Sequence, residues 1–305
     1  MNFESELKAA VEAVHKASKL CIRVQSSLVS EETVRKKDDS PVTVADFGAQ
    51  AVICHELMKA FPDIPIVAEE DSSELRAEGG KALSARVLEY ASEVFPGMDE
   101  ASLIASIDSG DYGGGESGRF WTLDPIDGTK GFLRGEQYAV ALALIEDGQV
   151  VIGVLGCPNL PLDLKNPESQ TGCILTAVRG GGSSMRPLEH NTPKHIAVSD
   201  IDDPKHAPFC ESVESSHSSH GDSARIAELL GVKEANEVWV PLGVTVAVLV
   251  ELKLGLDTKV AEGVAVGIGL LPAVLVAVAD TLAVIVGVRV GLAIAAGLGS
   301  MVGVM

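Results

Sequence analysis

The sequence contains few aromatic residues, few basic residues and no closely spaced pair of cysteines. Phe, Trp and Tyr make up 4% of its 305 residues. Lys and Arg number 24 against 43 Asp and Glu, which gives a formal net charge of −19 at pH 7. A chain this acidic does not present the basic surface that nucleic acids require, so we expect no nucleic-acid partner.

The cysteines argue against two common scaffolds. Their number is five, which is odd, and no two of them have the Cys-x-x-Cys spacing of a zinc site. They are Cys21, Cys54, Cys157, Cys173 and Cys210. A reducing cytoplasm suits such a chain. Residues 1–8 point the same way, because they are acidic and lack the features of a signal or transit peptide.

The last part of the sequence almost lacks charge. Residues 263–305 are mainly Gly, Ala, Val, Leu and Ile, and their only charged side chains are Asp280 and Arg289. Their glycine and valine content and the missing aromatic belt argue against a membrane span. Two interpretations stay open. The segment is either a set of buried strands, which the valines support, or a stretch that has left its ancestral reading frame, which we favour.

The most informative part of the sequence is an acidic motif at residues 121–135. It places two aspartates three residues apart around a proline, followed by a glycine and a threonine. Two carboxylates and an inward-pointing carbonyl are hard ligands for a divalent cation, and the residues after them can meet an anion with N–H and hydroxyl groups. The alternative is an Asx-Pro turn with solvated carboxylates. The candidate residues are Asp124, Ile126, Asp127, Gly128 and Thr129.

Two further acidic blocks precede this motif. Residues 40–46 (SPVTVAD) end in Asp46, and residues 67–71 (VAEED) contain Glu69. With the DPIDGT sequence of the motif, these blocks resemble in order and spacing the inositol monophosphatase superfamily. Its members are magnesium-dependent, lithium-sensitive phosphomonoesterases.

The residues after the motif narrow the resemblance to one branch of that superfamily. Residues 130–140 and 156–160 are similar to the 3'(2'),5'-bisphosphate nucleotidases, which remove the 3'-phosphate of adenosine 3',5'-bisphosphate. The resemblance extends over roughly residues 1–235. It implies a small nucleotide as substrate, with 3'-phosphoadenylyl sulfate as a second one, and a role in sulfate assimilation and salt tolerance.

The resemblance also implies a site for two or three Mg²⁺ ions. On the family pattern, Glu69, Asp124 and the Ile126 carbonyl would hold one ion. Asp124 and Asp127 would hold a second, and Asp46 with Glu69 would engage a third, weaker one. Asp46 and the Thr129 hydroxyl would form the proton-accepting pair.

Substrate contacts are implied at two places. Gly128, Thr129 and Lys130 would lie beside the phosphate. His217 belongs to a Ser/His-rich segment that resembles the branch's nucleotide-contacting block, whereas the same segment taken alone is typical of a helix cap.

The sequence departs from the family at its last metal ligand, which belongs to a Trp-Asp-His block. The only tryptophans here are Trp121 and Trp239, and Trp239 is followed by Val240. Changes around a metal site commonly cost about 10 to 100-fold in affinity or activity, so we expect an impaired enzyme. The alternatives are an inositol polyphosphate 1-phosphatase and a non-catalytic protein that binds nucleotide or metal.

The predicted fold is α+β or α/β, with the layered αβαβα sandwich that the family resemblance implies. Three regions are expected: an amino-terminal α+β domain with the metal site, a partial carboxy-terminal α/β domain, and an apolar tail unlike the family. Their bounds are residues 1–155, 156–235 and 236–305. A monomer is favoured, with the oligomeric state left open.

Hydrophobic spacing predicts the principal elements. Helices are expected at residues 5–30 and 49–61, and strands at residues 64–68, 139–145, 149–157, 173–178 and 195–198. Residues 71–118 are polar and glycine-rich, which predicts an insertion or mobile lobe with a helical middle.

Overall fold

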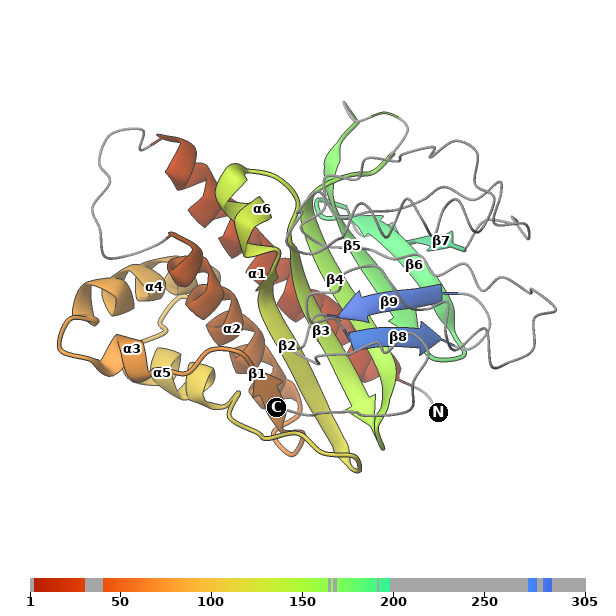
Figure 1. Cartoon of the computed structure of the whole chain (residues 1–305), viewed down its shortest axis with the longest axis horizontal. Coiled ribbons are helices and arrows are strands. Elements are labelled where there is room, and N and C mark those ends of the chain that lie inside the picture. Colours follow the sequence, from red (N-terminus) through yellow and green to blue (C-terminus); the bar gives the residue numbers. More distant parts are fainter. Residues whose placement is uncertain are drawn as a thin grey trace, which may run out of the picture.

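A computed structural model describes residues 3–30, 41–163, 166, 169–190, 192–197, 274–278 and 282–286. Two long helices come first and are followed by three shorter ones and a single turn-like helix after the acidic motif (Figure 1). The helices are α1 (Glu4–Ser30), α2 (Pro41–Ala60), α3 (Ser73–Arg76), α4 (Lys81–Val94), α5 (Glu100–Asp108) and α6 (Thr129–Arg134).

Seven strands form one sheet in the order β1-β2-β3-β4-β5-β6-β7. β1 pairs with β2 in parallel, and every other neighbouring pair in this sheet is antiparallel. The strands are β1 (Ile66–Ala68), β2 (Arg119–Asp127), β3 (Ala139–Glu146), β4 (Gln149–Pro161), β5 (Thr171–Val178), β6 (Gly182–Pro187) and β7 (Lys194–Ile196). A separate antiparallel pair consists of β8 (Val274–Val278) and β9 (Leu282–Val286).

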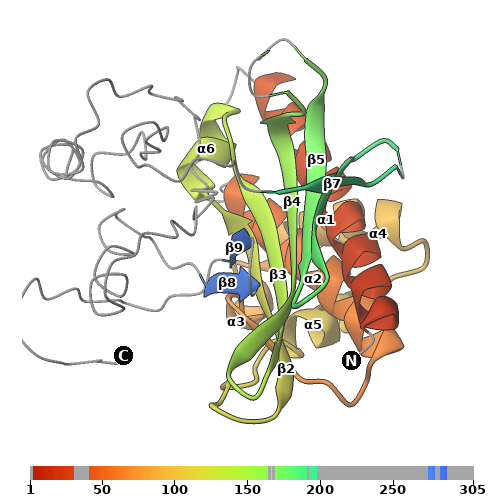
Figure 2. The ribbon, with the colours of Figure 1, turned by 90° about the vertical axis from the view of Figure 1, so that its right-hand side faces the viewer.

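The main core lies between this sheet and α1 with α2. Alternation along β3 shows how it is built, because Val140, Leu142 and Leu144 join that core, whereas the intervening alanines join a second apolar cluster on the other face. Figure 2 shows α1 and α2 on one face of the sheet and the β8–β9 pair on the opposite one. Both faces of β3 are therefore buried, and the predicted layered α/β architecture is confirmed in the described part of the chain.

The helices α3 to α5 correct the prediction of a mobile lobe over residues 71–118. α4 and α5 pack against α2 and contribute Leu83, Val87, Leu103 and Ile107 to the main core. Their buried faces make this segment an outer helical layer of the same body. The second helix also begins earlier than predicted, at Pro41 instead of residue 49.

The strands predicted at residues 139–145 and 149–157 are confirmed as β3 and β4, which pair as a hairpin. β3 and β4 are joined by a tight turn in which Asp147 has φ 50° and Gly148 has φ 73°. β4 crosses the domain boundary placed at residues 155 and 156, and β5 to β7 extend the same sheet. The division of the chain into domains stays a prediction.

Several predictions fall outside the described residues. These are the nucleotide contact of His217 and most of the apolar tail, and Cys210 also lies outside the described residues. Within that tail the structure describes only the two strands β8 and β9. None of the described helices has the length and apolarity needed to cross a membrane.

Candidate active site

Asp46 lies on helix α2, whereas the predicted helix begins only at residue 49, after Asp46. Val44, Ala45 and Phe47 around it are buried in the core, so the helix face is fixed by packing. A helical position is more rigid than a loop position, because the backbone hydrogen bonds and the packed face hold the Asp46 carboxyl in one direction.

Glu69 directly follows β1, as the sequence predicted. β1 lies beside β2 in parallel register, with Ala68 opposite Leu123. Glu69 therefore leaves the sheet next to the strand that carries Asp124. Parallel strands end at the same edge of a sheet, which is why these two acidic segments meet.

Asp124 and Asp127 lie at the end of β2 instead of in a free turn, which corrects the predicted conformation of the motif. Asp124 pairs with Ala141 and Asp127 with Ala139, so four residues of β2 (124–127) span the interval that three residues of β3 (139–141) take. This register shift is a β-bulge. Side chains three residues apart in a regular strand point to opposite faces, and the extra residue returns both carboxylates to the same face.

Gly128 and Thr129 turn the chain from β2 into α6. Gly128 has φ 94° and caps the helix in the left-handed region, which a side chain would disfavour. The Thr129 hydroxyl donates to the Ile126 carbonyl at 3.5 Å. No hydrogen bond joins Thr129 to Asp46 in the described part of the chain, so their pairing stays a prediction.

Burial and mutual repulsion dominate the electrostatics of these acids. Burial raises the pKa of Asp46 to about 8, and the Glu70 and Glu69 carboxylates add to the shift. Burial also raises the pKa of Asp124, and the carboxylates of Asp127, Glu69 and Asp46 raise it further. Burial raises the pKa of Asp127 as well, with the Glu69 carboxylate as a second cause. The structure therefore brings all four predicted carboxylates into one neighbourhood.

The donor set of this neighbourhood fits a divalent cation. Asp124 Oδ1 is buried and has no hydrogen-bond partner among the described residues. In that same part of the chain, none of the four carboxylates pairs with a lysine, arginine or histidine. Buried like charges without a compensating cation are costly, and hard oxygens are the ligands that Mg²⁺ prefers.

The carboxylates form a shared neighbourhood and not a closed coordination shell. No three acidic, imidazole or thiol groups of the described residues converge closely enough to hold a metal ion as they stand. The carboxylates are nevertheless near enough to raise one another's pKa, and rotations of the side chains about their χ angles would turn them towards a common ion.

An amide network anchors α6 against α1 and β4. Gln25 of α1 donates from Nε2 to the Phe132 carbonyl at 2.8 Å. Asn159 of β4 donates from Nδ2 to Gln25 Oε1 at 3.1 Å and to the Glu136 carbonyl at 2.6 Å. Gln137, which is 5% exposed, donates to the Asn159 carbonyl. The helix that follows the acidic motif is thus tied to two distant elements.

Thr129 and Lys130 lie in the first turn of α6, where both are exposed. They follow Asp127 closely in the chain, and their contact with the phosphate stays a prediction. Arg134 lies at the far end of α6 and pairs with Glu136 at 3.5 Å. His217 lies outside the described residues, so its proposed contact with the nucleotide stays a prediction.

Sequence reasoning missed two residues of this neighbourhood, Glu70 and Gln50. Burial raises the pKa of Glu70 to about 7, with Glu69 adding to the shift. Gln50 is fully buried on α2 and bonds the backbone of Glu70. The available signal for Gln50 was its spacing of four residues from Asp46, which places both on one helix face.

Comparisons with known proteins agree on one family. Residues 2–255 match the model of the inositol monophosphatase family. The chain is similar to 3'(2'),5'-bisphosphate nucleotidase 1 of Arabidopsis thaliana, with 45% identity over 251 residues, 76% of this chain and 71% of that protein. It is also similar to the 3'(2'),5'-bisphosphate nucleotidase of Schizosaccharomyces pombe, with 44% identity over 249 residues, 76% of this chain and 70% of that protein.

Solved structures are more distant. CysQ from Bacteroides thetaiotaomicron, described as a bacterial member of the inositol monophosphatase family, is 19% identical with a TM-score of 0.41. That match covers 74% of this chain and 69% of the CysQ chain. The family model extends past residue 235 to residue 255, so the departure expected from residue 236 begins later in this comparison.

Proposed function

Because the chain belongs to the inositol monophosphatase family, we propose that it is a magnesium-dependent phosphomonoesterase that removes the 3'-phosphate of adenosine 3',5'-bisphosphate. The substrate is suggested by the names of relatives with 44% and 45% identity. The observation that carries the proposal is the cluster of Asp46, Glu69, Asp124 and Asp127, which includes a buried carboxylate oxygen without a described partner.

The residues of the cluster would coordinate the metal ions. Glu69, Asp124 and the Ile126 carbonyl would hold one Mg²⁺, and Asp124 with Asp127 a second. When bound, Mg²⁺ neutralises phosphate charge and lowers the pKa of water. Two or three ions follow the family precedent, and Asp46 with Glu69 would hold the weakest.

The residues around the metal would then align the substrate. Gly128 and Thr129 form the turn from β2 into α6, where a phosphate can accept from backbone N–H groups. Lys130 in the same turn adds a positive charge, and phosphate transfer depends mainly on such positioning and charge neutralisation. Thr129 would lend its hydroxyl to the proton-accepting pair with Asp46, and His217 would contact the nucleotide.

We further propose that this polypeptide is a slower enzyme than its relatives. It lacks the Trp-Asp-His block that carries the family's last metal ligand. A missing ligand lowers metal occupancy at a given Mg²⁺ concentration, so higher concentrations should restore part of the rate. The sulfate-assimilation role, the activity on 3'-phosphoadenylyl sulfate, the lithium sensitivity and the cytoplasmic location belong to the same proposal.

Substrate choice tests the proposal. Phosphate release should be measured for the full chain with adenosine 3',5'-bisphosphate and with inositol 1,4-bisphosphate at the same concentrations of substrate and Mg²⁺. We expect the nucleotide to have the higher kcat/KM, and release to be slower than with the Arabidopsis thaliana relative. A preference for the inositol phosphate would instead identify an inositol polyphosphate 1-phosphatase. Nucleotide binding without release would identify a non-catalytic protein.

A further inference from the structure

Gln50 joins the helix that carries Asp46 to the loop that carries Glu69. It lies on α2, four residues after Asp46, and its side chain is 0% exposed. A buried amide needs partners for two donors and one acceptor group, and Gln50 finds all of its described partners on the backbone beyond β1 and at the end of α5.

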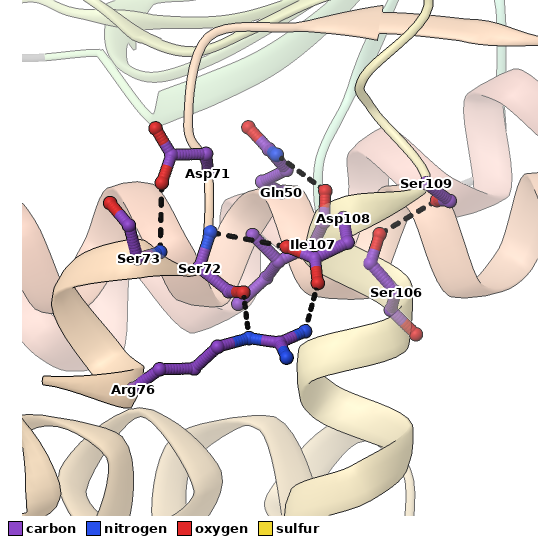
Figure 3. Close-up of polar contacts among 9 residues, drawn as sticks. All are labelled: Gln50, Asp71, Ser72, Ser73, Arg76, Ser106, Ile107, Asp108 and Ser109. Carbon is purple, nitrogen blue, oxygen red and sulfur yellow. Dashed lines mark hydrogen bonds and ion pairs between the residues drawn. The ribbon is translucent and has the colours of Figure 1, made fainter.

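The contacts of Gln50 act on both sides of one residue. Its Oε1 accepts from the Glu70 N–H at 2.9 Å, and its Nε2 donates to the Glu70 carbonyl at 2.6 Å. A third bond runs from Nε2 to the Ile107 carbonyl at 3.0 Å (Figure 3). The side chain thus pairs with Glu70 much as a neighbouring strand would, at a place where β1 has already ended.

The residue before Glu69 is fixed as well. The Ala68 N–H donates to the Gly110 carbonyl at 2.9 Å, and Ala68 pairs with Leu123 in the sheet. Glu69 therefore lies between Ala68 and Glu70, and hydrogen bonds fix the backbone of both. Gly110 makes this possible, because a Cβ there would lie 2.6 Å from Ala68 Cβ and 3.1 Å from Gln50 Nε2.

A second set of bonds holds the far end of the same loop (Figure 3). The Ser72 N–H donates to Asp108 Oδ1 at 3.2 Å, and Arg76 Nε donates to Ser72 Oγ at 2.7 Å. Arg76 also pairs with Asp108. The loop of residues 69–73 is thus hydrogen-bonded to α2 on one side and to α5 on the other. Gln50 makes the loop's hydrogen bonds to α2, the helix that carries Asp46.

We propose that Gln50 is a positioning residue that holds Glu69 beside Asp46, an inference that rests on the proposed metal-dependent function. The described hydrogen bonds of Gln50 all go to backbone groups, and none goes to a carboxylate of the cluster. It acts through the Glu70 backbone, which limits the directions that the Glu69 carboxylate can take. Partners that orient metal ligands in this way commonly matter by about 10 to 100-fold in metal affinity.

The test compares Gln50→Met with a matched control. Methionine keeps the length and apolar volume of the side chain but removes all three bonds. Thr176→Val is the control, because it removes a side-chain hydrogen bond of 2.8 Å between Thr176 on β5 and Ser184 on β6. These two strands do not carry any residue of the acidic cluster. Mg²⁺ affinity should be measured by titration calorimetry on the full chain, and protection of the Glu70 amide by hydrogen exchange.

We expect Gln50→Met to lose protection at the Glu70 amide and to weaken Mg²⁺ binding by about 10 to 100-fold, with Thr176→Val near the wild type in both. If Gln50→Met does not fold, Gly110→Ala tests the same hydrogen bonds, because the new Cβ would displace Gln50 Nε2 and Ala68.

Unchanged Mg²⁺ affinity in a folded variant whose Glu70 amide has lost protection overturns the inference, as does a wild type that binds no Mg²⁺. Intact Mg²⁺ binding without release of phosphate from adenosine 3',5'-bisphosphate overturns only the proposed substrate.

Discussion

Asp124 and Asp127 share one face of β2 because a single extra residue interrupts the strand register between them. Pro125 lies in this unpaired interval. Proline has no N–H to donate, so it is tolerated at a bulge, where the strand makes no regular hydrogen bond to its neighbour. The bulge thus converts an alternating strand into a pair of carboxylates directed to one side. The chemistry of the site depends on this local irregularity as much as on the acids themselves.

The raised pKa of Asp46 leads to a prediction at the scale of one residue. The ordinary value for the carboxyl is 3.8, and in the folded chain burial raises the pKa to about 8. The native state therefore binds this proton more tightly than the unfolded state does. Its contribution to the free energy of unfolding is present below pH 4 and is lost as pH rises towards 8.

Denaturant unfolding in EDTA across this pH range measures the effect. The amide introduced by Asp46→Asn cannot titrate, so this variant should lose less stability between pH 4 and pH 8 than the wild type does. The comparison cancels the groups that both proteins share. Parallel stability curves for the two proteins would show that Asp46 keeps an ordinary pKa.

The four carboxylates could be predicted from sequence because each belongs to a short motif of fixed spacing. Gln50 and Glu70 could not, because their roles depend on which backbone groups lie beside them after folding. The same limit explains why the predicted second helix begins at residue 49 and leaves Asp46 outside it. The turn-forming residues before Pro41 are visible locally, whereas the packing that makes residues 41–60 helical is not.

At the scale of elements, α1 lies against β4 at a glycine. A Cβ on Gly156 would lie 2.2 Å from Ser18 Oγ and 2.8 Å from Val14 Cγ1, both on α1. The helix can approach the strand this closely only because Gly156 has no side chain. This contact sets the distance between the helical layer and the sheet, and through Gln25 and Asn159 it supports the position of α6.

Gly156→Ala should therefore push α1 away from the sheet. We expect a loss of about 1 to 3 kcal/mol in the free energy of unfolding, the usual range for overpacking a core. Gly113→Ala makes the same chemical change at a site with no atom within 4 Å of the new Cβ, and it should be close to neutral. Urea denaturation of both variants checks this, and equal stabilities would contradict the proposed close contact.

The outer helices show what hydrophobic periodicity can and cannot predict. The helical middle predicted within residues 71–118 is confirmed as α4 (Lys81–Val94). Its membership of the main core was not expected, since the surrounding residues are polar and rich in glycine. Whether an apolar stripe meets a core depends on long-range packing, which composition averaged over residues 71–118 conceals.

At the scale of the whole molecule, the proposed function pairs an acidic chain with an acidic substrate. The formal net charge is −19, and a nucleotide bisphosphate adds further negative charge. Attraction between protein and substrate must therefore come from bound cations and from local groups such as Lys130. Raised ionic strength should screen the long-range repulsion, whereas removal of Mg²⁺ should abolish binding of the phosphate.

The most direct test of the acidic cluster is the rate of phosphate release from adenosine 3',5'-bisphosphate by the full chain, with Mg²⁺ or with EDTA. The wild type should be compared with Asp124→Asn, and with Glu78→Gln as an exposed charge-removing control. We predict slow release that requires Mg²⁺, is retained in Glu78→Gln and is lost in Asp124→Asn. Equal rates in wild type and Asp124→Asn, or release that persists in EDTA, would contradict the account.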